Sequence, residues 1–305
     1  MTIITSRTRT NGTIHIDYQK CTSCGLCAKI CKDGSLKMEN GNLGISDSPA
    51  FGCFGCGQCM AVCPEDAIRV EGRELSIDDL IDLPKSEEKS TYKQLYSLML
   101  GRRSIRDFKK QEIDKEVVDQ LIEAALTAPV GLPPSDVHLL VLEGRKKVCE
   151  FAFEAIDQIG KAAWMFMPPG LWLWRLLAGK EAHELMKGFG WPLINKLTSH
   201  KEANEDYLLY DAPLAMYFMS SPYSDPNDPV IPATYAMLAA ESLGLGSCMI
   251  GSIHPFLRYG AKRFKMKWGI PQKSTNGIVV VFGYPKYKYQ HALKRTFAQV
   301  NIYEN

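Results

Sequence analysis

Ten cysteines stand in this 305-residue chain, and eight of them fall into two dense blocks. The first block is CTSCGLCAKIC, residues 21–31, and the second is CFGCGQCMAVC, residues 53–63. Both have the spacing C-x₂-C-x₂-C-x₃-C, and each cysteine of the second lies 32 residues after its counterpart. The first twenty residues contain no apolar run of the kind a secretory signal needs. Thiols this close together therefore indicate metal ligands, with disulfides as the alternative.

The spacing also bears on the kind of metal. A zinc site typically uses two C-x₂₋₄-C pairs and has no use for a third cysteine at the same short interval. Three cysteines spaced by two residues, with a remote fourth, suit a cubane cluster in which each iron atom takes one thiolate. Zinc remains the alternative metal.

Residues 1–75 resemble the bacterial two-cluster ferredoxin, a pseudo-symmetric α+β unit. In that family the fourth cysteine of each block ligates the other cluster. Lys32 stands where many ferredoxins have proline after the fourth cysteine, which changes a turn but no ligand. The resemblance implies two [4Fe–4S] clusters, with Cys21, Cys24, Cys27 and Cys63 on cluster 1 and Cys53, Cys56, Cys59 and Cys31 on cluster 2.

A second stretch that could do chemistry is GRRSIRDF, residues 101–108. It gathers three permanently charged guanidinium groups, whose planar forks match phosphate oxygens, and one hydroxyl. The stretch follows a predicted helix, where the dipole disfavours anions, so side chains would have to hold a phosphate. A solvated basic turn is the alternative interpretation.

Two further segments give this stretch a context. AALTAPVGLPPSDV occupies residues 124–137, and AAESLGLGSCMIGS occupies 239–252. The three-part arrangement resembles the FMN-dependent nitroreductase family over residues 90–300. That family has an RRSxRxF opening, an APSGxNxQPW loop and a GLGTCWIG-like segment before the last strand.

The nitroreductase resemblance implies a set of FMN contacts. The basic opening would hold the phosphate and ribityl chain, the loop would approach the flavin from the partner subunit, and the third segment would pass its backbone along the ring edge. A basic pair after the last strand fits a further phosphate contact. In order, these residues are Arg102, Arg103, Ser104 and Arg106; Pro129, Val130 and Gly131; Met249, Ile250, Gly251 and Ser252; and Lys294 and Arg295.

The middle loop departs from the family pattern. Pro133, Ser135 and Val137 replace the asparagine, glutamine and tryptophan. Hydrogen bonds from those side chains to flavin or substrate are lost, so the family's nitroaromatic preference does not carry over directly. No side chain is predicted to be catalytic.

These groups need elements to position them. Ile14 with Ile16, and Ile68 with Val70, alternate as strands around the cysteine blocks. We expect a ferredoxin domain at 1–75, a linker at 76–90 with one short helical turn at 76–82, and a flavin domain at 91–305. The flavin domain is expected to be α+β, a mixed sheet flanked by helices.

The pattern of apolar residues predicts the helices and strands of the flavin domain. Apolar residues at helical spacing predict helices over 92–101 and 114–128, the second capped by Asp114 and stopped by Pro129. Apolar runs bounded by turn residues predict buried strands within 137–144, 212–221 and 276–285.

An aromatic-rich insert at 160–210 is either a lid over the flavin or a structural or dimer-packing element. Its most apolar part, 162–179, is broken by prolines and too short to span a bilayer; membrane-surface contact is the alternative.

Composition narrows the function classes. Hydrophobic content of 46% describes a globular protein, and a net charge of +2 gives no basic excess for nucleic acid.

We predict a cytoplasmic homodimer from an anaerobic or microaerobic organism. Its clusters would relay electrons from ferredoxin or another low-potential donor to FMN, which would reduce a nitro compound or similar electrophilic small molecule. An adaptor that passes electrons to a protein acceptor is the alternative, followed by an iron–sulfur protein that has lost FMN.

Overall fold

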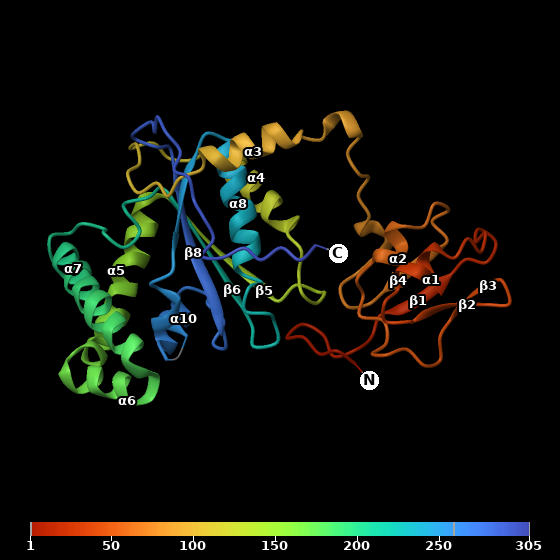
Figure 1. Cartoon of the computed structure of the whole chain (residues 1–305), viewed down its shortest axis with the longest axis horizontal. Helices are drawn as coiled ribbons and strands as arrows, with labels where there is room; N and C mark the ends of the chain where they lie inside the picture. The colour runs from red at the N-terminus through yellow and green to blue at the C-terminus, as the bar shows by residue number, and fades with distance from the viewer. Residues whose placement is uncertain (1, 259, 305) are drawn as a thin grey trace.

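The computed structural model describes residues 2–258 and 260–304. A small cysteine-rich domain and a larger domain are joined by an extended connection (Figure 1). The small domain contains β1 (Thr13–Ile16), α1 (Leu26–Ile30), β2 (Leu36–Glu39), β3 (Asn42–Ile45), α2 (Gln58–Ala61) and β4 (Ile68–Glu71). Strand β1 pairs antiparallel with β4, and β2 with β3, so the strands expected around the cysteine blocks are confirmed.

Both helices of the small domain begin at a glycine inside a cysteine block. Gly25 and Gly57 have φ of 75° and 71°, a left-handed conformation that glycine adopts without steric cost. The helices that follow carry Cys27 and Cys59 into the domain core, against Ile68. The repeat in sequence is therefore a repeat in structure.

The connection to the larger domain is exposed and has two single-turn 3₁₀ helices, η1 (Ile77–Asp79) and η2 (Ser86–Glu88). Helix α3 (Tyr92–Gly101) follows, with the expected bounds. The Thr91 side chain caps it by accepting the amide of Gln94. None of the α3 side chains is buried against the described part of the chain, so its apolar residues remain exposed.

The larger domain is built on a four-stranded sheet of order β5-β6-β8-β7. Its strands are β5 (Val137–Glu143), β6 (Leu214–Ser220), β7 (Gly246–Ile250) and β8 (Asn276–Gly283). All three pairings are antiparallel, and a parallel bridge from Ser104 to Ser247 extends the sheet beyond β7. Three of these strands were expected. Strand β7 was missed as a strand because its small residues Gly246 and Ser247 have little strand preference.

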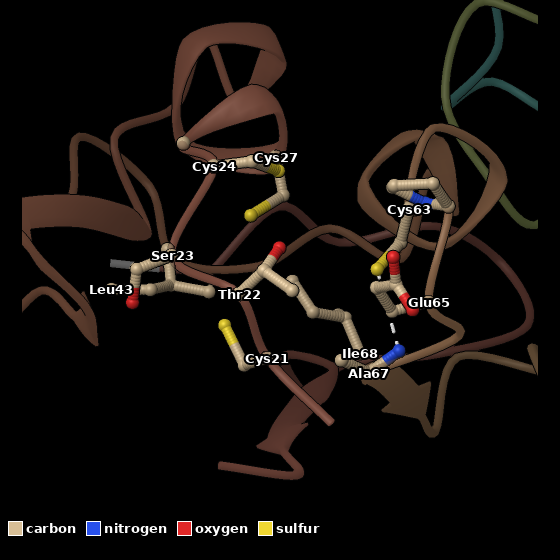
Figure 2. Close-up of a pocket in the computed structure, with 12 residues that line it drawn as sticks. Cys21, Thr22, Ser23, Cys24, Cys27, Leu43, Cys63, Glu65, Ala67 and Ile68 are labelled. Carbon is tan, nitrogen blue, oxygen red and sulfur yellow. Dashed lines mark hydrogen bonds between the residues drawn. The ribbon is translucent and has the colours of Figure 1, made fainter. Parts of the chain in front are cut away.

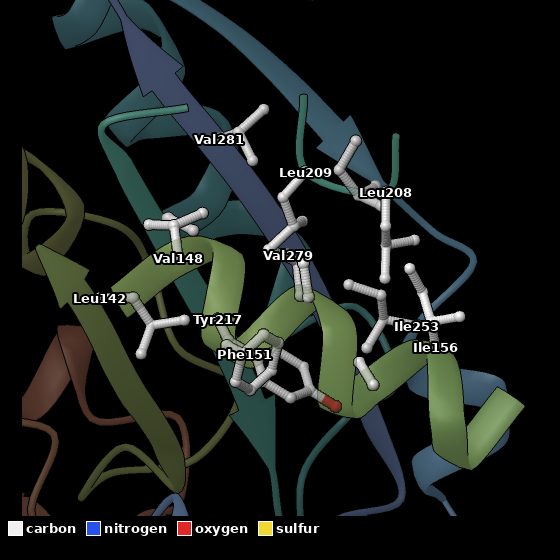
Figure 3. Packing of buried hydrophobic residues seen from close by; sticks show 14 of the residues in the cluster. Leu142, Val148, Phe151, Ile156, Leu208, Leu209, Tyr217, Ile253, Val279 and Val281 are labelled. Carbon is white, nitrogen blue, oxygen red and sulfur yellow. The ribbon is translucent and has the colours of Figure 1, made fainter. Parts of the chain in front are cut away.

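Helices cover both faces of the sheet, which is why the central strands are continuously apolar. On β6, Met216 and Phe218 face α4 (Lys115–Leu126) and α8 (Val230–Ser242). The alternate residues face a second layer, formed by α5 (Arg145–Lys161), α9 (His254–Leu257) and α10 (Lys262–Lys267). There the Phe151 ring meets Tyr217 edge-on (Figure 3). The same ring also meets Trp268 edge-on. The expected α+β class is confirmed.

Helix α4 has the expected position but not the expected cap. Asp114 stands at its N-cap position, yet its side chain accepts no capping hydrogen bond in the described structure. Val118, Leu121 and Ala125 are the buried face.

The insert is helical and packs beside α5. It contains η3 (Ala163–Phe166), α6 (Pro168–Leu185), the π-helical turn η4 (Met186–Gly190) and α7 (Trp191–Glu202). Phe166, Ile194 and Leu197 join the core, whereas Trp172 and Leu177 of α6 are exposed. In the described residues, no helix combines the length and apolarity that a membrane crossing requires.

Candidate functional site

Four cysteines from both blocks line one cavity of the small domain. They are Cys21, Cys24, Cys27 and Cys63, named here the Cys21 set. Figure 2 shows these side chains around a common space. Burial raises the pKa of the Cys27 thiol, and the neighbouring Cys63 and Cys21 raise it further. The amide of Ala67 donates to the Cys63 sulfur at 3.3 Å.

The other four block cysteines line a second cavity. They are Cys31, Cys53, Cys56 and Cys59, named here the Cys53 set. Burial raises the pKa of Cys59 to about 12, with Cys53, Cys56 and Cys31 contributing. Each set thus takes three cysteines from one block and the last cysteine from the other.

The two cavities fit the groups that the ferredoxin resemblance implies. Each offers four soft thiol donors around a partly open cavity, and a bound metal deprotonates coordinating thiols whose own pKa is high. Across residues 2–258 and 260–304, no three metal-ligating side chains lie close enough to share a single ion.

The basic segment after α3 runs in extended conformation along β7. The Ile105 amide donates to the Ser247 carbonyl at 3.0 Å. Extended backbone points successive side chains to opposite sides. Arg103 and Ile105 line a cavity with Tyr289, while Arg102, Ser104 and Arg106 all act on the Cys248 side chain.

The arginines consequently have different surroundings. The Arg103 guanidinium lies 5.5 Å from the centre of the Tyr289 ring, and that of Arg106 lies 5.8 Å from the Tyr210 ring centre. Burial raises the pKa of the Cys248 thiol, an effect that the Arg106 charge opposes. The structure brings three of the four expected phosphate contacts to one side and turns Arg103 to the other.

The basic segment and the strand beside it contain buried donors without partners in the described part of the chain. Arg102 Nη1 and Ser247 Oγ are both buried, and neither finds a hydrogen-bond partner among the described residues. Buried donors of this kind are uncommon and call for a partner. A phosphate oxygen beside the basic segment would satisfy Arg102 Nη1, so this place fits the FMN phosphate that the resemblance implies.

The expected loop contacts lie at the other end of the sheet. Pro129, Val130 and Gly131 precede β5, whose first residue pairs with Ser220, whereas the basic segment lies beside Gly246. The seven residues of β5 separate these ends by roughly 20 Å. One chain does not bring the two groups together.

The remaining expected contacts are placed as follows. Met249 and Ile250 end β7, and Gly251 and Ser252 form the turn after it. Lys294 and Arg295 lie in the exposed C-terminal segment, outside any helix or strand.

Several residues at these places were missed in the sequence. Cys248 is buried and is acted on by the arginines of the basic segment. Its place inside the third family-like segment was an available signal. Tyr210, at the end of the insert, and Glu241, on which Arg102 acts electrostatically, had none.

Comparison with known proteins bears on both domains. The nitroreductase family model matches residues 99–284, and that of the 4Fe-4S dicluster domain matches residues 20–68. A search of curated proteins found no match.

Solved structures similar to this chain include nitroreductases with bound FMN. That from Desulfitobacterium hafniense is 20% identical and has a TM-score of 0.48, covering 69% of this chain and 98% of its own. That from Bacteroides fragilis is 18% identical with a TM-score of 0.48, covering 69% and 99%. An FMN-dependent nitroreductase from Clostridium difficile is 20% identical with a TM-score of 0.48, covering 68% and 99%. With its model matched over most of the larger domain, this chain belongs to the nitroreductase family and carries a 4Fe-4S dicluster domain on the N-terminal side.

Proposed function

We propose that this protein is an FMN-dependent oxidoreductase in which two [4Fe–4S] clusters relay electrons to FMN for the reduction of an electrophilic small molecule. One observation carries the proposal. Two four-cysteine cavities occur in the same chain as a basic segment whose buried donor, Arg102 Nη1, lacks a partner within the described residues. Bound FMN supplies the exchange between single electrons and electron pairs.

The residues of the chain hold and orient the cofactors. The Cys21 set and the Cys53 set each hold one cluster. Arg102, Ser104 and Arg106 hold the FMN phosphate. Arg103 packs on Tyr289 and contributes mainly positive charge.

A homodimer completes the flavin site in this proposal. The basic segment and the loop with Pro129 lie at opposite ends of one sheet, so a second copy supplies the loop. Two exposed apolar surfaces suit such an interface. One is α3, with Leu95 and Met99, and the other is the C-terminal segment, with Leu293 and Phe297, of which Phe297 is 84% exposed.

The acceptor is proposed to be a nitro compound or a similar small molecule, and the donor a ferredoxin or another low-potential carrier. A protein acceptor is a second candidate. The observation that favours it is the exposed apolar face of α6, where Trp172 is 64% and Leu177 75% exposed.

A screen of oxidants tests the proposal. The protein is purified anaerobically, its iron, sulfide and FMN are measured, and the dithionite-reduced form is mixed with small oxidants or with oxidised carrier proteins. We expect rapid reoxidation of the flavin by one class of small electrophile. Reoxidation by carrier proteins alone would favour the second candidate, and a protein that binds no FMN would refute both.

A further inference from the structure

Arg73 is a buried arginine whose side chain donates to four backbone carbonyls. The residue lies just after β4 in the chain and is 4% exposed. Nε donates to the Phe54 carbonyl at 2.9 Å, and Nη1 donates to the carbonyls of Ile3 and Thr10 at 2.8 and 2.9 Å. Nη2 donates to the Pro133 carbonyl at 2.7 Å. One guanidinium thus connects the small domain to the larger one.

On the small-domain side, Arg73 holds the loop of the Cys53 set. Phe54 lies between Cys53 and Cys56 and lines their cavity. A Cβ at Gly55 would lie 3.1 Å from that of Arg73, so the two backbones are in close approach. Burial lowers the pKa of the guanidinium, and the neighbouring Cys53 opposes that shift.

On the other side, Pro133 belongs to a loop that is held by the N-terminal segment as well. Ser6 donates to the buried carboxylate of Asp136 from its amide at 2.9 Å and from its hydroxyl at 2.6 Å. Ser221, just past β6, donates to the same carboxylate at 2.8 Å. Arg7 donates to the Ser135 carbonyl at 2.8 Å. Figure 1 shows the N-terminal segment reaching this end of the sheet.

The internal repeat shows that Arg73 belongs to one half of the small domain. The position 32 residues earlier is Gly41, in the turn between β2 and β3. Both turns have left-handed backbone, with φ of 80° at Gly41 and 56° at Arg73. A Cβ at Gly41 would meet nothing within 4 Å. The half with Gly41 faces open space, and the half with Arg73 faces the flavin domain.

We propose that Arg73 is a positioning residue that docks the loop of Cys53 and Cys56 onto the loop of Pro133, which makes the cluster of the Cys53 set the exit of the relay. This rests on the proposed function. Each transfer oxidises the cluster of the Cys21 set by one electron and reduces that of the Cys53 set by one. Two such transfers, with protons from solvent, supply the electron pair for the flavin. A buried cation beside Cys53 stabilises the reduced, more negative cluster, which favours transfer toward it.

The test uses the full-length, cofactor-loaded protein and the variant Arg73→Gly, which copies the turn of the other half and tolerates positive φ. Arg73→Lys keeps the charge but loses the fork. Arg69→Gln, at an exposed arginine of β4, is the matched control. Three quantities are measured: amide hydrogen exchange in residues 129–137, the two cluster potentials by redox titration with electron paramagnetic resonance, and the rates of cluster and flavin reduction.

For Arg73→Gly we expect about tenfold faster exchange in residues 129–137, because charge-assisted bonds to the loop are lost. The reduction potential of the Cys53-set cluster should fall, while that of the Cys21-set cluster should stay unchanged. Flavin reduction slows about tenfold or more while cluster reduction by the donor is unchanged. Arg73→Lys should keep both cluster potentials but show faster amide exchange in residues 129–137. Arg69→Gln should behave as the wild type in all three measurements.

Unchanged exchange and flavin reduction in Arg73→Gly would overturn the proposal. Loss of iron, or a shift of both potentials, would also overturn it by showing a general structural role. Wild-type protein whose reduced clusters never reduce the flavin would refute the proposed function itself. The exchange measurement would still report separately whether Arg73 docks the loop.

Discussion

The backbone amide of Ile105 donates to the carbonyl of Ser247 at 3.0 Å and fixes the basic segment beside β7. This register turns Arg102 toward Cys248 and Arg103 toward Tyr289. Two adjacent arginines of one motif are therefore expected to differ in their importance for FMN.

Replacing Arg102 should weaken FMN binding most. In Arg102→Ala a buried charge-assisted donor is lost, which costs about 1.5–3 kcal/mol and corresponds to an FMN dissociation constant about ten- to a hundredfold higher. Arg103→Ala should have a smaller effect because its guanidinium packs on Tyr289. Fluorescence titration of the apoprotein with FMN measures both. Equal effects, or an unchanged constant in Arg102→Ala, would contradict the assigned orientation.

Two cubane clusters should give about eight iron atoms and eight sulfides per chain after anaerobic reconstitution. Cys63→Ser should damage the cluster held by Cys21, Cys24 and Cys27, because these four line one cavity. The comparison variant is Cys31→Ser, which should damage the other cluster. Magnetic spectroscopy of the two variants distinguishes the clusters. Stoichiometric zinc, or damage by Cys63→Ser to the cluster of the Cys53 set, would show the assignment to be wrong.

Stability of the larger domain should depend on pH through His254. This residue is 7% exposed, its Nδ1 lies 2.7 Å from the Tyr217 hydroxyl, and burial lowers its pKa below 6.5. The unfolded chain therefore binds the proton first. As pH falls below about 6.5, stability should decrease by at most about 1.4 kcal/mol per pH unit, until the folded state also takes the proton.

Tryptophan fluorescence can measure this effect because all five tryptophans lie at or beyond residue 164, outside the small domain. Thermal midpoints are compared at about pH 7.5 and about pH 5.5. His254→Gln should lose part of the acid sensitivity, whereas His15→Gln, in the small domain, should keep it. Identical acid sensitivity in wild type and His254→Gln would exclude His254 as the cause.

The parts of this protein that were predictable from sequence depend on local spacing. The spacing of the cysteine blocks predicts iron–sulfur ligands, and the apolar runs of β6 and β8 predict buried strands. No role was predicted for Arg73, because its partners Phe54 and Pro133 are 19 and 60 residues away. The split between Arg102 and Arg103 needed the register against Ser247. Such long-range contacts produce no periodic pattern in the amino-acid sequence.

The proposed relay makes the small domain the electron entry. A hydride donor needs no cluster, so the covalent domain is useful if single-electron carriers are the main supply. Covalent linkage also holds the clusters at high effective concentration near the flavin.

Anaerobic stopped-flow reduction of the flavin tests this central claim most directly. Reduced ferredoxin and NADH are each mixed with the full-length protein and with a chain shortened to residues 91–305, whose FMN content is measured first. We expect both proteins to bind FMN, ferredoxin to reduce the full-length flavin faster than NADH does, and the shortened chain to lose most of the ferredoxin-driven rate. Equal ferredoxin-driven rates in the two proteins, or faster reduction of the intact protein by NADH, would contradict the account.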